Sequence, residues 1–99
     1  MYQIAYVESI ADDLKGLQAG QRRQILNRIE QQLIHEPTRQ TRNRKPLAGL
    51  VPPWEYVEPV WELRIGEYRV FYDVDEAAAV VIVRAVRHKP PHKTTEEIL

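Results

Sequence analysis

The sequence predicts an α+β fold in which two N-terminal helices pack on one face of a small, mostly antiparallel sheet. Apolar residues recur every three or four positions early in the chain, as in amphipathic helices, and every second position after Glu55, as in half-buried strands. Short turns separate the later strands, which favours antiparallel pairing. The 99 residues predict a single domain over 1–99 with the element order β-α-α-β-β-β.

The first third of the chain predicts a strand and two helices. Residues 2–7 are rich in β-forming side chains and predict a short strand. Ser9 is the expected N-cap of the first helix, and residues 21–35 predict a second helix that ends before Pro37. Each helix carries an apolar stripe that is expected to enter the core: Ile10, Leu14 and Leu17, then Ile25, Ile29 and Leu33.

Residues 36–53 contain Pro, Gly, Asn and Arg without a clear period and predict a long loop. A loop of this length is unusual in so small a domain and is often functional. The chain end, residues 95–99, is expected either to form a short helix or to remain disordered.

The second half predicts three strands, at residues 60–65, 68–74 and 78–88, joined by tight turns. Alternation directs one set of apolar side chains toward the helices. The opposite face is expected to carry charged side chains at period-two positions, with Ile82, Arg84, Val86 and His88 sharing one side of the last strand. The polar members of this face are Glu62, Arg64, Arg69, Arg84 and His88. Such a face is expected to be a working surface, and a merely solvated face is the alternative.

The net charge of the chain is zero, because 14 basic and 14 acidic residues cancel. Only the local distribution of charge can therefore indicate a partner. Residues 38–53 and 85–94 contain no acid, and bases gather in and beside both segments: Arg39, Arg42, Arg44 and Lys45, then Arg84, Arg87, Lys89 and Lys93, with His88 and His92. On one face, the two segments would form a positive field for a polyanion. Two solvated loops are the alternative interpretation.

The composition excludes several classes of protein. The absence of cysteine excludes disulfide frameworks, thiolate nucleophiles and cysteine-based zinc sites. The longest apolar run, residues 77–83, is far shorter than the roughly 20 residues that span a bilayer. The N-terminus lacks the basic and apolar regions of a signal peptide. We therefore expect a cytoplasmic protein that uses no cofactor.

Two motifs stand in order along the chain, RKPLAG at residues 44–49 and LRIGEYRVFY at residues 63–72. The first resembles the Lys-Pro-Leu-x-Gly loop, and the second resembles the Arg-x-Gly-x-Tyr-Arg strand pair, of the RelE/ParE superfamily of toxins from type II toxin–antitoxin modules. The resemblance extends from Tyr2 to about Lys93. It implies the RelE-like fold, and it implies a cognate antitoxin protein that forms a hetero-oligomer with the toxin.

The resemblance implies one of two activities. RelE-like members are mRNA endoribonucleases that cut at the ribosome without metal, whereas ParE-like members poison DNA gyrase. We expect a RelE-like toxin of the plasmid-stabilisation kind, an mRNA interferase that binds mRNA and the ribosome and inhibits translation. A ParE-like gyrase poison and a degenerate toxin that only binds its antitoxin are the alternatives. The active-site tyrosine and lysines of many RelE-like enzymes are missing, which leaves these alternatives open.

Three residues are expected to carry the cleavage. Arg69 matches the superfamily arginine that contacts the scissile phosphate, a role that suits a planar and always charged guanidinium. The alternative is a structural arginine paired with an acid such as Glu62. His88 is expected to exchange a proton. Glu62 is the candidate general base, and its position differs from that of the carboxylates in relatives.

Further residues are expected to bind RNA: Arg44, Lys45, Arg64, Arg84, Arg87, Lys89 and His92. Arg87 and His88 are neighbours on one strand, so alternation places only one of them on the working face. A β-bulge, which is common near active sites, would exchange the two.

Overall fold

The computed structural model describes all 99 residues and confirms the predicted α+β fold. In chain order its elements are β1 (Gln3–Tyr6), α1 (Ile10–Lys15), α2 (Ala19–Leu33), β2 (Arg44–Leu47), β3 (Val60–Ile65), β4 (Tyr68–Asp75), β5 (Val80–His88) and α3 (Thr95–Ile98). The strands form one sheet in the order β1-β5-β4-β3-β2, antiparallel except for the β1–β5 pair. No helix has the length and apolar character that a membrane span requires.

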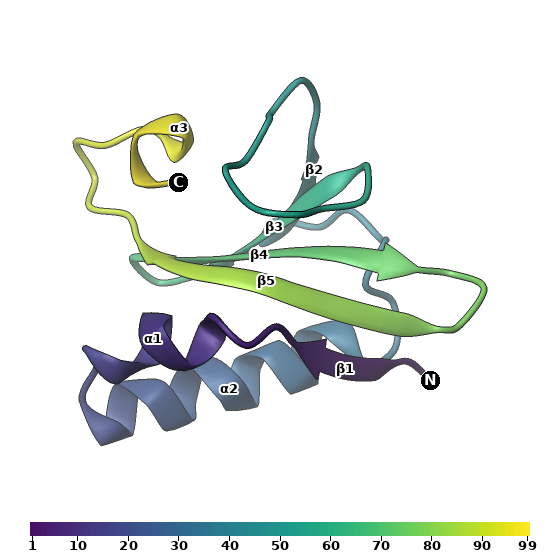
Figure 1. Cartoon of the computed structure of the whole chain (residues 1–99). Helices are drawn as coiled ribbons and strands as arrows, with labels where there is room; N and C mark the ends of the chain where they lie inside the picture. The colour runs from purple at the N-terminus through teal and green to yellow at the C-terminus, as the bar shows by residue number, and fades with distance from the viewer.

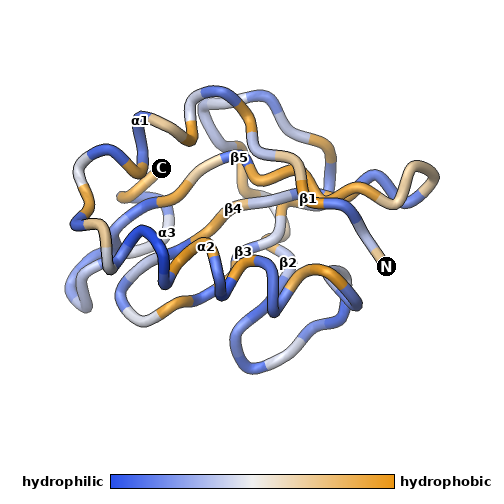
Figure 2. Tube along the Cα trace, turned by 90° about the horizontal axis from the view of Figure 1, so that it is seen from below, coloured by the Kyte–Doolittle hydropathy of each residue, from blue (hydrophilic) through white to orange (hydrophobic).

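The helices α1 and α2 lie together on one face of the sheet, while α3 and the loop between β2 and β3 lie over the other face (Figure 1). The main core forms between α1, α2 and the sheet, from the predicted stripes and from alternate strand residues. Its buried members are Ile10, Leu14, Ile25, Ile29, Leu33, Trp61, Leu63, Ile65, Val70, Tyr72, Val81, Val83 and Val86. Figure 2 shows apolar colour along much of the central strands and polar colour on much of the rest of the chain.

The opposite face carries a second, smaller core, so it is not the continuous charged face that alternation predicts. Val60, Phe71 and Ala85 are buried at its centre. The loop before β3 and the C-terminal residues cover them through partly buried apolar side chains: Leu47, Leu50, Trp54, Tyr56, Ile98 and Leu99. On this face, the second core separates the Arg84–Asp73 ion pair from the polar residues at the end of the sheet near the β3–β4 turn.

The long loop expected over residues 36–53 contains a strand. β2 pairs antiparallel with β3, and Lys45 lies opposite Glu62. Arg44 anchors this strand to α2, because its Nη1 donates to the carbonyl of Gln32 at 2.6 Å and to the carbonyl of Glu36. These carbonyls belong to the end of α2 and the turn that follows it. The sequence pattern does not predict this strand, because RKPL has no alternation and includes a proline.

A β-bulge divides the pairing of β4 with β5. Phe71 lies opposite Ala85, but the next residue, Tyr72, lies opposite Val83, so Arg84 is the extra residue. The expectation that Val86 and His88 share a face with Arg84 is therefore wrong. Beyond the bulge, Val86 packs in the helix-side core and Arg87 lies opposite Arg69. Ser9, the expected N-cap of α1, makes no capping hydrogen bond with its side chain.

Tyr72 ties the segment after α2 to the sheet. Its buried hydroxyl donates to the carbonyl of Pro37 at 2.6 Å, and burial raises its pKa, so it remains a donor. Tyr72→Phe leaves that carbonyl unpaired and is expected to lower the free energy of unfolding by about 1–2 kcal/mol in urea titrations. Tyr6→Phe, on the exposed edge strand, is the control and is expected to change it by less than about 0.5 kcal/mol. Equal losses in the two variants would contradict this assignment.

Candidate functional site

A polar pocket of about 160 Å³ lies on the face opposite α1 and α2, at the end of the sheet near the β3–β4 turn. All eight of its lining residues are polar, and they include five bases but only one acid. They are Arg42, Asn43, Lys45, Glu62, Arg64, Arg69, Lys89 and Thr95. This excess of positive charge in a concave site suits an anionic group such as a phosphodiester.

Strands β2, β3 and β4, the segments just before β2 and just after β5, and the C-terminal helix build this pocket. The antiparallel registers place Lys45 opposite Glu62 and Arg64 opposite Arg69. Because side chains alternate across a sheet, Glu62 and Arg64 emerge on the same side of β3. Lys89 follows the last residue of β5, and Thr95 is the first residue of α3.

Arg69 is the most firmly held base of the pocket and is only 8% exposed. Its Nη1 donates to the carbonyls of Gly66 and Tyr68, both at 2.9 Å. Gly66 has a φ of 58°, a backbone conformation that glycine adopts without strain at this tight turn. Burial lowers the pKa of the Arg69 guanidinium, Glu62 opposes this lowering, and Arg64 adds to it. The hydrogen bonds of its guanidinium within the chain are made by Nη1, and none is made by Nη2.

Glu62 is the single acid of the pocket and is 5% exposed. Its Oε1 lies 3.9 Å from the Nε of Arg69, and its Oε2 accepts a hydrogen bond of 3.0 Å from the Thr95 hydroxyl. The structure thus brings together two of the three residues expected to carry cleavage. The carboxylate is oriented from both sides, by a cation and by a hydroxyl.

Three of the seven residues expected to bind RNA line this pocket: Lys45, Arg64 and Lys89. The other four do not. Arg44 is buried and holds the end of α2. Arg84 pairs with the buried carboxylate of Asp73 through bonds of 2.9 and 3.2 Å. His92 is exposed in the turn before α3.

Arg87 lies on the same face of the sheet as Arg69 but is engaged elsewhere. Its Nη1 lies 2.8 Å from Oδ1 of Asp13 on α1. Its guanidinium also lies 5.3 Å from the ring centre of Trp54, which in turn packs on Phe71. Arg87 therefore links α1 to the second core, and it is absent from the pocket lining.

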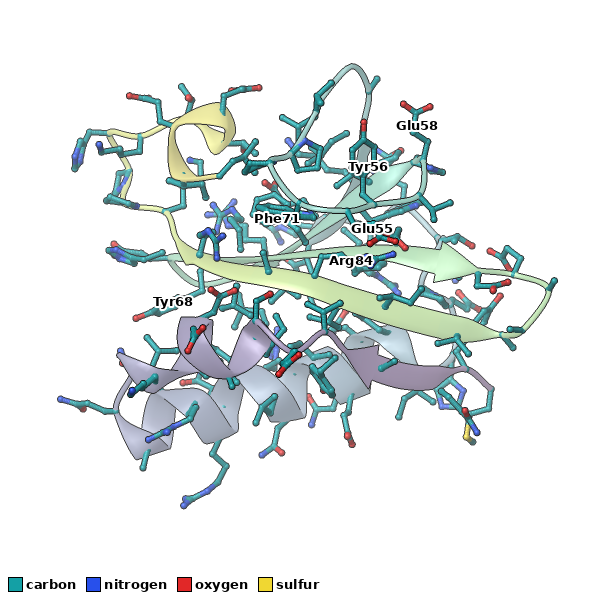
Figure 3. The ribbon with its side chains drawn as sticks, viewed as in Figure 1. Glu55, Tyr56, Glu58, Tyr68, Phe71 and Arg84 are labelled. Atoms are coloured by element: carbon teal, nitrogen blue, oxygen red, sulfur yellow. The ribbon has the colours of Figure 1, made fainter.

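His88 lies on the helix side of the sheet, away from Arg69. Its Nε2 is 3.0 Å from Oε1 of Glu67, and its ring centre is 5.2 Å from that of Tyr68. Figure 3 shows the two sides: Tyr68 points toward α1 and α2, whereas Phe71 and Arg84 lie on the opposite face. The bulge at Arg84 causes this separation, because it reverses the side-chain direction along the rest of β5.

Three members of the pocket are not among the expected site residues: Arg42, Asn43 and Thr95. Asn43 had no distinguishing signal, and Thr95 reaches Glu62 across 33 positions of sequence, a separation that no local pattern reveals. Arg42 belongs to the basic segment that is expected to contact the RNA backbone. Nowhere in the chain do three or more His, Asp or Glu side chains gather in a way that could hold a metal ion.

Comparison with known proteins gives one family and several similar folds. The family model for the "ParE toxin of type II toxin-antitoxin system, parDE" matches residues 4–89. No curated protein sequence matches the chain significantly. A chain of the archaeal RelE–RelB complex from Pyrococcus horikoshii OT3 is similar, with a TM-score of 0.68 and 21% identity over 94% of this chain and 98% of that chain.

Two further solved structures are similar to this chain. The isolated E. coli RelE toxin has a TM-score of 0.67 and 19% identity, over 98% of this chain and 94% of that chain. A chain of the RelBE2 toxin–antitoxin complex from Mycobacterium tuberculosis has a TM-score of 0.66 and 22% identity, over 89% and 98%. At these identities, the structures show a shared fold.

Proposed function

Because the chain belongs to the ParE toxin family, within the RelE/ParE superfamily of type II toxin–antitoxin systems, we propose that it is a toxin that cleaves mRNA without a metal ion and so inhibits translation. One observation carries this proposal: the buried Arg69–Glu62 pair lies in a pocket that four further bases line. A carboxylate and several cations are the groups that cleavage of an RNA phosphodiester requires.

The chemistry we propose is attack by the ribose 2′-oxygen on the adjacent phosphorus. Glu62 takes the proton of the 2′-hydroxyl, and the 2′-oxygen forms a new bond to phosphorus. Arg69 and Arg64 stabilise the negative charge on the phosphorane oxygens. The bond from phosphorus to the 5′-oxygen then breaks, and Lys89 donates a proton to that oxygen. The products are a 2′,3′-cyclic phosphate and a 5′-hydroxyl.

A ParE-like gyrase poison is the second candidate function. The match to the ParE toxin model favours it. The contacts of Arg69 are also compatible with it, because an arginine held by an acid and two carbonyls can serve the fold alone. Such a toxin would act by binding, and the pocket would need no proton transfer.

Induced expression in bacteria separates the two candidates, with protein synthesis and DNA supercoiling measured in the same culture. We expect protein synthesis to fall first, with cut mRNA and normally supercoiled DNA. Loss of supercoiling with intact mRNA would overturn the proposal in favour of the gyrase poison.

We also propose a cognate antitoxin as partner. Several similar structures are complexes of a toxin with its antitoxin. An acidic segment of an antitoxin would complement the positive pocket around Arg69 and would keep RNA out of it.

Lys45 offers a test of RNA binding by the pocket. It is exposed on the outer strand β2 and lines the pocket. Lys45→Glu is expected to weaken binding of an uncleavable 2′-O-methyl oligonucleotide and to reduce the slope of log K against log salt by roughly 0.7. Lys15→Glu, at the end of α1 on the helix side, is the matched control and should bind like the parent. Identical binding curves for the parent and Lys45→Glu, measured by fluorescence anisotropy, would remove Lys45 from the RNA contacts.

A further inference from the structure

A second pocket, of about 340 Å³, lies on the helix side of the sheet end, and the proposed cleavage does not use it. Its lining residues come from the first half of α2, the β3–β4 turn and the end of β5: Gln21, Gln24, Ile25, Ile65, Gly66, Glu67, Tyr68 and His88. The volume falls at the lower end of the range for small-molecule sites, about 300–1,000 Å³. A pocket of this size suits a small molecule with a single ring system better than it suits part of a folded protein.

The two pockets lie back to back across the same turn. Gly66 lines the helix-side pocket, and its carbonyl accepts a hydrogen bond from Arg69, which lines the polar pocket. At the end of β5, His88 lines one pocket and its neighbour Lys89 lines the other. The amide of Lys89 donates to the Glu67 carbonyl at 2.6 Å and closes this end of the sheet. A strand of nucleic acid that crosses the turn would meet both pockets.

The lining of the helix-side pocket suits a flat, polar-edged ring. The buried side chains of Ile25 and Ile65 form an apolar floor. The rings of Tyr68 and His88 lie 5.2 Å apart, with 50° between their planes, and offer an aromatic wall. Gln21 and Gln24 are exposed on the rim. Aromatic rings stack on bases, and a side-chain amide both donates to and accepts from a base edge.

The charges of this pocket do not favour a phosphate. Its only acid, Glu67, lies 3.0 Å from His88, and no lysine or arginine lines the pocket. The bases that would hold a phosphate all lie in the polar pocket on the other side of the turn. The polar pocket therefore suits the phosphate of a nucleotide, and the helix-side pocket suits its base.

We propose that the helix-side pocket binds one nucleobase of single-stranded RNA, next to the phosphate that Arg69 contacts, and sets a base preference. The assignment of that base to an RNA substrate rests on the proposed cleavage function. The capacity of the pocket to bind a base does not, because it depends only on the residues that line it.

Nucleosides without phosphate test the pocket by itself. In NMR titrations of the full chain with adenosine, guanosine, cytidine and uridine, we expect saturable shifts of the Gln24 side-chain amide and the Gly66 and Glu67 backbone amides, with one nucleoside binding more tightly than the others. Gln24→Ala and His88→Ala should each weaken this binding about tenfold. Gln31→Ala, an exposed residue two turns further along α2, is the matched control and should bind like the parent. Absence of shifts, or shifts that neither variant alters, would overturn the proposal.

Glu62→Gln separates this outcome from that of the cleavage proposal. The variant should bind nucleosides like the parent, because Glu62 lines only the polar pocket and contacts Arg69 and Thr95, neither of which lines the helix-side pocket. If nucleosides bind but no RNA is cut, the base pocket stands and the cleavage function fails. If RNA is cut but no nucleoside binds, the cleavage function stands and the base pocket fails.

Discussion

Arg69→Ala is expected to slow RNA cleavage about a hundredfold, which corresponds to about 3 kcal/mol of transition-state stabilisation. Two carbonyls hold the guanidinium in place before any ligand arrives, and its Nη2 makes no hydrogen bond within the chain. The charge is thus positioned in advance for the phosphorane oxygens. Initial cleavage rates of the purified proteins provide the measurement.

The control for Arg69→Ala is Arg84→Ala. Both arginines lie on the same face of the sheet, and both pair with a buried acid. Each variant is expected to lose stability, because a buried carboxylate loses its partner. Only Arg69→Ala should lose cleavage per folded molecule, and equal rates for the two variants would remove Arg69 from the chemistry.

Glu62→Gln is expected to slow cleavage by about a hundredfold or more, in line with the loss of a general base. Glutamine keeps the size of the side chain and can still accept the hydrogen bond from Thr95, but it cannot take the proton of a 2′-hydroxyl. The loss should therefore appear in the maximal rate at saturating RNA, with RNA affinity largely retained.

Glu96→Gln is the matched control for Glu62→Gln. It makes the same chemical change on an exposed residue beside Thr95 and should cleave like the parent. If Glu62→Gln retains the full maximal rate, Glu62 is only the structural partner of Arg69 and the base lies elsewhere.

Periodicity was enough to predict most of the fold. The apolar stripes of α1 and α2 repeat within one helical turn, and the alternation of β3 and β4 repeats every two positions. Side chains from both patterns lie in the core, as expected. The second core was not predictable in this way. It joins Trp54 and Tyr56 from a loop without periodicity to Ile98 and Leu99 at the chain end.

The candidate site is harder to predict from the sequence than the fold. One bulge residue decides which side chains of β5 lie on the same face of the sheet as Arg69. Arg84 adds a single position to β5, and the sequence VVIVRAVRH looks the same with or without a bulge. From there on, the side chains reverse, so His88 leaves the face that carries Arg69. Glu62 and Arg69 stayed together because no irregularity separates them in the β3–β4 pair.

The proposed cleavage is measured with the purified toxin and an RNA substrate, with and without ribosomes and in the presence of a metal chelator. We expect fragments with 2′,3′-cyclic phosphate and 5′-hydroxyl ends, formed by the parent and by Arg84→Ala but about a hundredfold more slowly by Arg69→Ala. Uncut RNA under all these conditions, together with inhibition of gyrase supercoiling by the same preparation, would contradict the proposed cleavage.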